Sequence, residues 1–420
     1  MTDKGKIVLI LGNGFDLAHG LPTKYSHFLD FCQRVERIWS YGTSNDKLTI
    51  ADFKRTWIDD WKTDASIKDA IEFEFCHRKI KINSEGIREI TSDSPELKEI
   101  HDLLDDNTWY EYFTKIYKNN YMKGENWIDF ESEIRFIIKV VDEHSLSLTD
   151  ILNDVINKAV ASLNDQKVKI FYKKFLSDKF LSKKGFDSNH LPIVKDFREK
   201  AFEDLERLTR ALELYLVNFV EKIPISDSKK IPEISSLNPD YVINFNYTDT
   251  YERIYHKGKV YHIHGKADAT RSAEDNNMVL GIDEYWIGDE QNEKTNFTIF
   301  KKFSQRIQKH TGNDSYKYLA EMQKLFRENT GWTGANDISK VHPDGVSYVY
   351  VFGHSLDVTD RDILSSFIGD DSTSVTVYCR DKGTEGELIA NTIKLIHEEK
   401  LLDKSNHVPT KLNYVIQKGK

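Results

Sequence analysis

The feature that most constrains the fold is a short apolar run near the start of the chain. Residues 7–11 (IVLIL) are all aliphatic, and the run stops at the turn Gly12-Asn13-Gly14. A continuous run of β-branched and aliphatic residues is typical of a strand buried on both faces of a parallel sheet. Apolar residues at helical spacing follow over residues 25–35, after Pro22. Strand, glycine turn and helix together predict a βα unit.

Further strand-like runs are found only in the second half of the chain. We expect strands at residues 241–246, 260–264, 278–281, 347–352 and 374–378, and helices at residues 361–367 and 385–400. Residues 37–235 carry long helical patterns without a strong strand run. The pattern predicts an α/β fold with a Rossmann-like parallel sheet core and a large helical insertion.

The expected domain organisation is therefore discontinuous. Residues 1–36 and 236–420 would form a Rossmann-like nucleotide-binding domain, and residues 37–235 a helical insertion domain, with a smaller helical excursion near 294–330. A chain of 420 residues suits two to three domains. Within the excursion, a run of basic residues predicts a modest basic face on solvated surface: Lys301, Lys302, Arg306, Lys309 and Lys317.

Charge and cysteine content exclude several classes of protein. The chain has 59 Lys and Arg against 68 Asp and Glu, and a net charge of −9 disfavours a protein that clamps nucleic acid over much of its surface. Cys32, Cys76 and Cys379 are too few and too scattered for a disulfide framework or a four-thiolate zinc site, so no metal is expected. No run approaches the roughly 20 apolar residues that span a bilayer. We expect a cytoplasmic protein without membrane contact.

The first of four motifs at predicted strand ends is Gly12-Asn13-Gly14-Phe15-Asp16. Glycine lets the backbone approach a phosphate, and a helix N-terminus offers N–H groups to it. The dinucleotide-binding fingerprint has a third glycine, but Leu17 stands in that position and Gly20 follows three residues later. A plain tight turn explains this motif equally well.

The next two motifs are Asn244-Phe245-Asn246-Tyr247-Thr248-Asp249 and His262-Ile263-His264-Gly265. An amide-rich strand exit points into the crevice where open α/β folds bind ligands, although an Asx-type turn also places Asn there. His264 can take or pass a proton near neutral pH, whereas we interpret His262 as structural.

The fourth motif is Gly353-His354-Ser355, followed by Asp360. Ser355 and Asp360 could contact a ligand, or Asp360 could cap the helix that follows. All four motifs lie at the carboxyl ends of predicted strands, which is the edge where this fold class builds its sites.

These motifs resemble those of a known family. Residues 11–23 (LGNGFDLAHGLPT), 244–248 (NFNYT), 262–265 (HIHG) and Gly353-His354-Ser355 with Asp360 are similar to the AbiH family of bacterial phage abortive-infection proteins. Residues 127–131 (WIDFE) also resemble an AbiH segment, although a helix start with acids favoured by the macrodipole explains them as well. The resemblance implies a role in phage defence.

The same four motifs, in the same order, are similar to those of the sirtuin-like NAD-binding enzymes. This resemblance implies that NAD lies across the strand ends as the substrate, with Asn246 and His264 as catalytic residues at the nicotinamide ribose. Two features depart from the pattern. The acid that sirtuin relatives often carry after their Asn is Thr248 here, and the chain has no Cys-x-x-Cys pair, so protein deacylation is not expected. The residues assigned to NAD binding are Gly12, Asn13, Gly14, Phe15, Asp16, Pro22, Gly265, Gly353, Ser355 and Asp360.

The leading hypothesis is an NAD+ hydrolase that releases nicotinamide and ADP-ribose. Asn246 would orient the ribose or the attacking water, His264 would hold a ribose hydroxyl or accept its proton, and the amides of residues 12–15 would bind the pyrophosphate. We also expect a phage-derived trigger or a partner protein, and a conformational or homo-oligomeric gate, because unrestrained NAD consumption would harm the host.

Two alternatives stay open. A non-catalytic nucleotide-sensing module would bind NAD or ADP-ribose without turnover, and Thr248 in place of an acid favours it. A nuclease acting on RNA or DNA would use acid pairs such as Asp59-Asp60 and Asp105-Asp106, which a solvated helical face explains as well.

Overall fold

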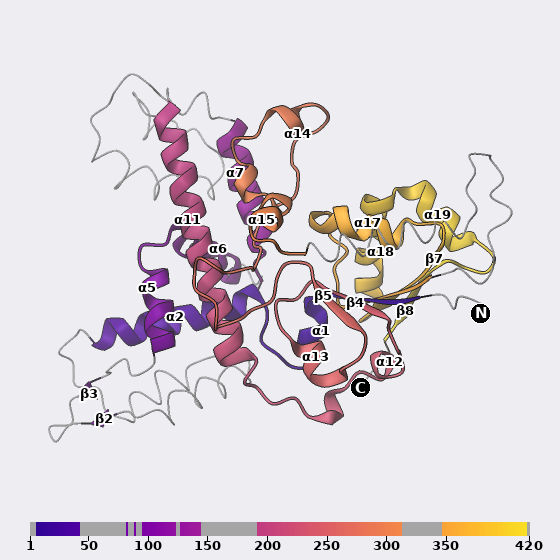
Figure 1. Cartoon of the computed structure of the whole chain (residues 1–420), viewed down its shortest axis with the longest axis horizontal. Coiled ribbons are helices and arrows are strands. Elements are labelled where there is room, and N and C mark those ends of the chain that lie inside the picture. The colour runs from indigo at the N-terminus through magenta and orange to yellow at the C-terminus, as the bar shows by residue number, and fades with distance from the viewer. Residues whose placement is uncertain are drawn as a thin grey trace. The chain divides into compact units, whose positions relative to one another are not determined.

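The computed structural model describes residues 6–42, 81–82, 88–89, 95–122, 127–143, 191–312 and 347–417. The chain divides into two compact units, and Figure 1 labels most of their helices and strands. The sheet unit comprises Met1–Leu21, Pro224–Ala267 and Arg306–Lys420, and the helical unit comprises Pro22–Ile223 and Asp268–Gln305.

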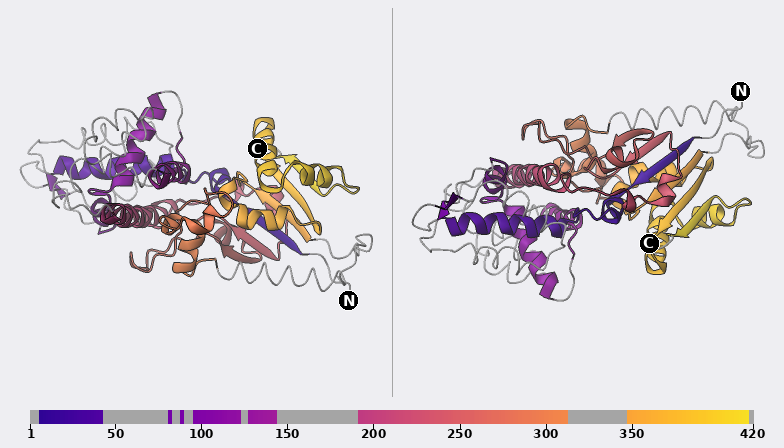
Figure 2. Two further views of the ribbon diagram at one scale, coloured as in Figure 1. Left: turned by 90° about the horizontal axis from the view of Figure 1, so that it is seen from above. Right: turned by 90° about the horizontal axis from the view of Figure 1, so that it is seen from below.

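The sheet unit is built on a six-stranded sheet of order β5-β4-β1-β6-β7-β8, in which every neighbouring pair is parallel. Figure 2 shows the indigo strand β1 lying among strands from the second half of the chain. The predicted Rossmann-like parallel sheet is confirmed. Its strands are β1 (Ile7–Leu11), β4 (Tyr241–Asn244), β5 (Lys259–His262), β6 (Ser347–Phe352), β7 (Thr373–Cys379) and β8 (Leu412–Ile416).

Helices cover both faces of this sheet. Val8 and Ile10 join a core with α17 (Arg361–Ile368), α18 (Lys382–Ile396) and α19 (Glu398–Asn406). Leu9 and Leu11 point to the opposite face, because successive side chains of a strand alternate. That face packs on α1 (Asn13–Ala18), α12 (Pro232–Ser235) and α13 (Thr250–Tyr255). Burial on both sides explains why β1 has no polar residue.

Two predicted elements differ from the structure. Residues 278–281 form no strand, although Met278, Val279 and Leu280 are buried. A short buried apolar run cannot be assigned to a strand by periodicity alone. The helix expected at 385–400 is two helices, α18 and α19, separated at His397, whose φ of 66° lies in the left-handed region.

The helical unit has an aromatic core in which α2 takes part. Phe31 of α2 lies 4.8 Å from Tyr215 and 4.6 Å from Phe219, measured between ring centroids, and Phe130 stacks on Phe113 at 4.1 Å. Helix α2 therefore belongs to this core. The units divide at Leu21/Pro22 and Ile223/Pro224, whereas the sequence led us to expect boundaries at 36/37 and 235/236. Its longer helices are α2 (Tyr25–Gly42), α5 (Pro95–Leu104), α6 (Thr108–Met122), α7 (Phe130–Glu143) and α11 (Leu191–Tyr215).

The shorter elements complete the described chain. A π-helical turn, η2, continues α11, and α15 spans the boundary between the two units near Gln305. The strands β2 and β3 pair antiparallel as a small separate ribbon. Their bounds are β2 (Lys81–Ile82), β3 (Arg88–Glu89), η2 (Leu216–Val220), η3 (Asp227–Lys229), α14 (Glu290–Glu293), η4 (Thr298–Phe300), α15 (Lys302–Gln308) and η7 (Val358–Asp360).

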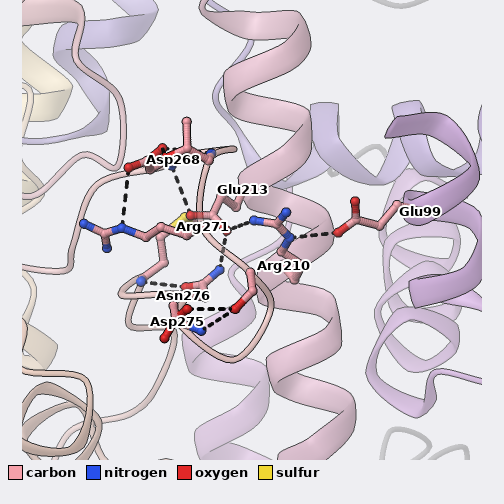
Figure 3. Close-up of polar contacts among 10 residues, drawn as sticks. Glu99, Arg210, Glu213, Asp268, Arg271, Asp275 and Asn276 are labelled. Carbon is pink, nitrogen blue, oxygen red and sulfur yellow. Dashed lines mark hydrogen bonds and ion pairs between the residues drawn. The ribbon is translucent and has the colours of Figure 1, made fainter. Parts of the chain in front are cut away.

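A polar network around Glu213 of α11 fastens the segment after Ala267 to the helical unit (Figure 3). The carboxylate of Glu213 accepts hydrogen bonds from Arg210 Nη1 at 2.7 Å, from Asn276 Nδ2 at 2.6 Å and from the backbone N–H of Asp268 at 3.0 Å. Arg210 Nε also donates to Glu99 Oε1 at 3.0 Å. Because Glu213 is fully buried, each of these donors offsets part of the free energy of burying its charge.

The prediction of a solvated basic face near residues 301–309 is wrong, because three of its residues are buried. Lys301 Nζ lies 2.6 Å from Glu284 Oε2, and Lys302 Nζ lies 2.7 Å from Glu131 Oε2. Both lysines are buried, because each has a carboxylate partner that compensates its charge. Arg306 is buried too and pairs with Asp362. Lys317 lies outside the described residues.

Candidate active site

Four strands of the sheet unit, β1, β4, β5 and β6, end in register with one another. Leu11 of β1 pairs with Asn244 of β4 and with Phe352 of β6, and Asn244 pairs in turn with His262 of β5. Parallel strands present their carboxyl ends at one edge of the sheet, so the four motifs of the sequence emerge there side by side. Asn246 and His264 each lie two residues beyond the paired Asn244 and His262, which end the neighbouring strands β4 and β5.

The glycines of this edge are required by the close packing of two turns. A Cβ on Gly12 would lie 2.5 Å from the Cα of His354, and one on Gly14 would lie 2.7 Å from the Cα of Gly353. Gly353 has a φ of 69°, and a Cβ there would lie 2.3 Å from the backbone nitrogen of Phe15. No other residue type fits these three positions without displacing backbone.

Three N–H groups of the glycine turn donate hydrogen bonds to backbone carbonyls of the protein. Gly12 donates to Phe352 O at 3.1 Å, Gly14 donates to Gly353 O at 2.8 Å, and Phe15 donates to Gly12 O at 2.9 Å. A pyrophosphate held by these amides, as expected from the sequence, would have to replace bonds that now join the two turns.

Asn246 ties the exit of β4 to the glycine turn. Its side-chain Nδ2 donates to Gly12 O at 3.1 Å, and its backbone N–H donates to Asn244 Oδ1 at 3.0 Å. Asn244 Nδ2 donates onward to Thr248 O at 3.4 Å. Both amides are buried, so their hydrogen bonds fix the path of this segment rather than compete with solvent.

Asp16 is the more deeply buried of the two acids, Asp16 and Asp360, at this edge. Thr248 Oγ1 donates to Asp16 Oδ2 at 2.6 Å, and the hydroxyls of Thr248 and Thr250 lie 3.1 Å apart. Burial raises the pKa of Asp16 to about 6, against the lowering effect of the Thr248 and Thr250 hydroxyls and of the charges on Arg253 and His262. The carboxyl therefore changes its charge within about a unit of neutral pH.

Two imidazoles, those of His264 and His354, share the carboxylate of Asp360. His264 Nε2 lies 2.9 Å from Asp360 Oδ1, and His354 Nε2 lies 3.5 Å from Asp360 Oδ2. The backbone N–H of Leu356 donates to His354 Nδ1 at 2.9 Å, so a neutral His354 carries its proton on Nε2, toward Asp360. Phe245 contacts both rings edge-on, with centroids 5.4 Å from His264 and 4.4 Å from His354.

His262 has structural contacts on both ring nitrogens. Its Nδ1 lies 3.0 Å from Asn246 O and its Nε2 lies 2.8 Å from Glu252 Oε1. The imidazole thereby joins the exit of β4 to α13, which is the kind of role that the sequence suggested for it.

The remaining candidates are distributed more widely. Phe15 is a core residue, whose ring lies 6.0 Å from that of Tyr255. Pro22 belongs to the helical unit, where its carbonyl accepts a hydrogen bond from Tyr215 OH at 2.8 Å. Asn13 and Ser355 are exposed at the edge, and Gly265 turns the chain after His264 with a φ of 84°.

Two residues of this edge received no role from sequence reasoning. His354 follows Gly353 directly at a strand exit, and that position was the available signal for its contact with Asp360. Thr250 gave no signal, because a hydroxyl that supports another hydroxyl has no pattern in the sequence.

Asp129 of the WIDFE segment caps α7, since its carboxylate accepts from the N–H of Glu131 at 3.0 Å and the hydroxyl of Ser132 at 2.6 Å.

Fold and site together define a class of protein: an α/β protein with a parallel sheet whose buried titratable side chains gather at the carboxyl edge. The family model described as bacteriophage abortive infection AbiH matches residues 8–379. The chain belongs to the AbiH family, as its motifs predicted, and it is a protein of phage abortive-infection defence.

No curated protein and no solved structure matches the chain. The likeness to sirtuin-like enzymes therefore stays a prediction. None of the helices in the described parts of the chain has the length and apolar character needed to cross a membrane.

Proposed function

We propose that this defence protein is an NAD+ glycohydrolase, which cleaves NAD to nicotinamide and ADP-ribose at the carboxyl edge of its sheet. The observation that carries the proposal is the register of the sheet: Asn246 and His264 each follow the end of one of two adjacent parallel strands by two residues, and Asn246 donates to the glycine turn. Ligands of open α/β sheets bind outside this edge.

The reaction needs groups that orient the ribose and stabilise an oxocarbenium-like state. The bond between C1′ of the ribose and the nicotinamide nitrogen breaks, and both electrons go to the nitrogen. A water oxygen bonds to C1′ and gives up one proton. His264 would hold a ribose hydroxyl or accept its proton, and Asp360 would stabilise the imidazolium that this produces. Asn246 would orient the ribose or the water through its amide.

The NAD assignment can be tested with purified protein and in infected cells. We expect release of nicotinamide from NAD by the purified chain, measured chromatographically, and loss of cellular NAD during infection. His264→Ala and Asn246→Ala should each reduce the release by about 100-fold or more. His407→Ala is the matched control, because His407 is exposed and outside this edge. Intact NAD in arrested cells, or unchanged release by both variants, contradicts the proposal.

A second function, nucleotide sensing without turnover, is favoured by the hydrogen bond from Asn246 Nδ2 to Gly12 O at 3.1 Å, because this bond holds the proposed catalytic amide within the protein. A sensor would show saturable binding of NAD or ADP-ribose in a calorimetric titration with no nicotinamide released. Absence of any binding would remove both functions.

A further inference from the structure

We propose that Asp16 is the carboxyl group that takes the proton of the attacking water, and that Thr248 and Thr250 hold it in place. This inference rests on the proposed hydrolysis of NAD and names the base of that same site.

The first support is the position of Asp16 in a closed circuit of contacts. Gly12 O accepts from the amide of Asn246, Asn244 connects Asn246 to Thr248, and the hydroxyl of Thr248 donates to Asp16 Oδ2. Gly12 is the N-cap of α1, the helix that follows β1, and Asp16 lies in that helix. The carboxylate is therefore held against the exit of β4, where Asn246 is expected to orient the reacting ribose.

The second support is the incomplete hydrogen bonding of this carboxyl. Only 1% of Asp16 is exposed, and its Oδ1 has no hydrogen-bond partner among the described residues. A buried acceptor without a donor destabilises a folded protein, and a catalytic role or a bound water is among the reasons for which a protein keeps one. A water molecule or a substrate hydroxyl would supply the missing donor.

The third support is the identity of residue 248. The resemblance to NAD-binding enzymes leads to the expectation of an acid at this position, where a carboxylate could activate water, but the chain has Thr248. In the structure, the Thr248 hydroxyl contacts a carboxylate that comes from the neighbouring strand exit. Asp16 follows β1 and Thr248 follows β4, the strand paired with β1. Asp16 thus places an acid 2.6 Å from the side chain at position 248.

The charged groups around Asp16 favour its ionised form, but their effect is smaller than the opposing effect of burial. Arg253 and His262 lower the pKa of Asp16, while burial raises it to about 6. Their own partners limit the effect, because Arg253 pairs with Asp249 at 2.7 Å and His262 with Glu252 at 2.8 Å. Lys266 lies 3.8 Å from Asp249 and 3.5 Å from Glu252. His19, the C-cap of α1, has its ring nitrogens 2.8 Å from Phe15 O and 3.1 Å from Tyr255 OH.

The proposed step is balanced in atoms and electrons. The water O–H bond breaks, its proton goes to Asp16 and its oxygen forms the bond to C1′ as nicotinamide leaves with the electrons of the glycosidic bond. Protonated Asp16 then releases the proton to solvent. A carboxyl with a pKa near 6 can do both at neutral pH, since it is mostly ionised yet only weakly acidic.

The test compares two isosteric variants. Asp16→Asn keeps an acceptor for Thr248 but cannot take a proton, so kcat should fall by about 100-fold or more with KM little changed. Asp30→Asn is the matched control, because burial also raises the pKa of Asp30 to about 6 while Asp30 lies in α2 of the helical unit. Its activity should equal that of the unchanged chain.

A pH profile separates proton transfer from a purely structural role. The rate should fall on the acid side with a midpoint near pH 6, and Thr248→Val should move that midpoint upward by about one unit, because the carboxylate loses its donor. Thr248→Ser should restore the original midpoint. An active Asp16→Asn variant, or coincident midpoints for the unchanged chain and Thr248→Val, would overturn the inference while leaving NAD hydrolysis intact. No hydrolysis by the unchanged chain would instead refute the proposed function, and this inference with it.

Discussion

The imidazole of His264 and the carboxylate of Asp360 are paired at 2.9 Å, although 96 residues separate them in the sequence. Asp360 occupies the N-cap position of α17, but its side chain makes no capping hydrogen bond. It faces His264 and His354 instead. A carboxylate in this position fixes the orientation of both rings and stabilises a positive charge on either one.

Removing that carboxylate should affect activity more than stability. Asp360→Asn keeps the volume and one acceptor but loses the charge, so the rate of the proposed NAD hydrolysis should fall by about 10- to 100-fold. Asp357→Asn is the control, because Asp357 caps the neighbouring turn through the N–H of Thr359 at 3.0 Å and has no contact with the two imidazoles among the described contacts. Equal activity of the two variants would show that Asp360 has no part in the reaction.

Two glycine substitutions should change stability in opposite directions. Gly353→Ala should lower the free energy of unfolding by about 2 kcal/mol or more, since Gly353 has a φ of 69° and no space for a Cβ. Gly386→Ala lies in α18 with no atom within 4 Å of the new Cβ, so it should raise that free energy by about 0.5–1 kcal/mol. Urea unfolding of both variants measures the difference.

Asp16 should make the stability of the protein depend on pH. The pKa of Asp16 is about 6 in the folded protein, against 3.8 for an ordinary Asp, so the folded state binds more protons between these values. The free energy of unfolding contributed by Asp16 therefore falls as the pH rises from about 4 to 6, and the loss is complete above that range.

Asp16→Asn removes this penalty. The variant should be more stable than the unchanged chain by about 2–3 kcal/mol at pH 7.5, and the difference should shrink toward zero near pH 4. Denaturant unfolding at several pH values measures it. A constant difference across this range would mean that Asp16 keeps an ordinary pKa in the folded protein. A gain in stability together with a loss of activity would identify Asp16 as a group retained for function.

The Glu213 network should control how firmly the segment after Ala267 is held. Glu213→Ala leaves Arg210, Asn276 and the N–H of Asp268 without their acceptor, and should destabilise the protein by about 3–5 kcal/mol. Limited trypsin digestion should then cut faster after Arg271. Glu203→Ala, at an exposed position of the same helix, should leave the cleavage rate unchanged. If cleavage is unaltered in Glu213→Ala, other contacts hold the segment.

The sequence was sufficient to place the four motifs at one edge of a parallel sheet. The apolar run of β1 requires burial on both faces, and a parallel arrangement then brings every strand exit to the same side. Helix α2 was harder to assign, because its apolar stripe fits a sheet and a helical core equally well. The contacts of Phe31 with Tyr215 and Phe219 show that α2 belongs to the helical unit.

The local pattern of the chain thus determined the α/β class, the strand exits and the family motifs, since periodicity and turn chemistry depend on neighbours in sequence. Only the tertiary structure decided which charges are buried and with whom they pair. Asp16 and Thr248 are 232 residues apart, and Lys301 and Lys302 are buried against Glu284 and Glu131. The free energy of burying a charge depends on the partner that the fold brings to it, and no local pattern encodes that partner.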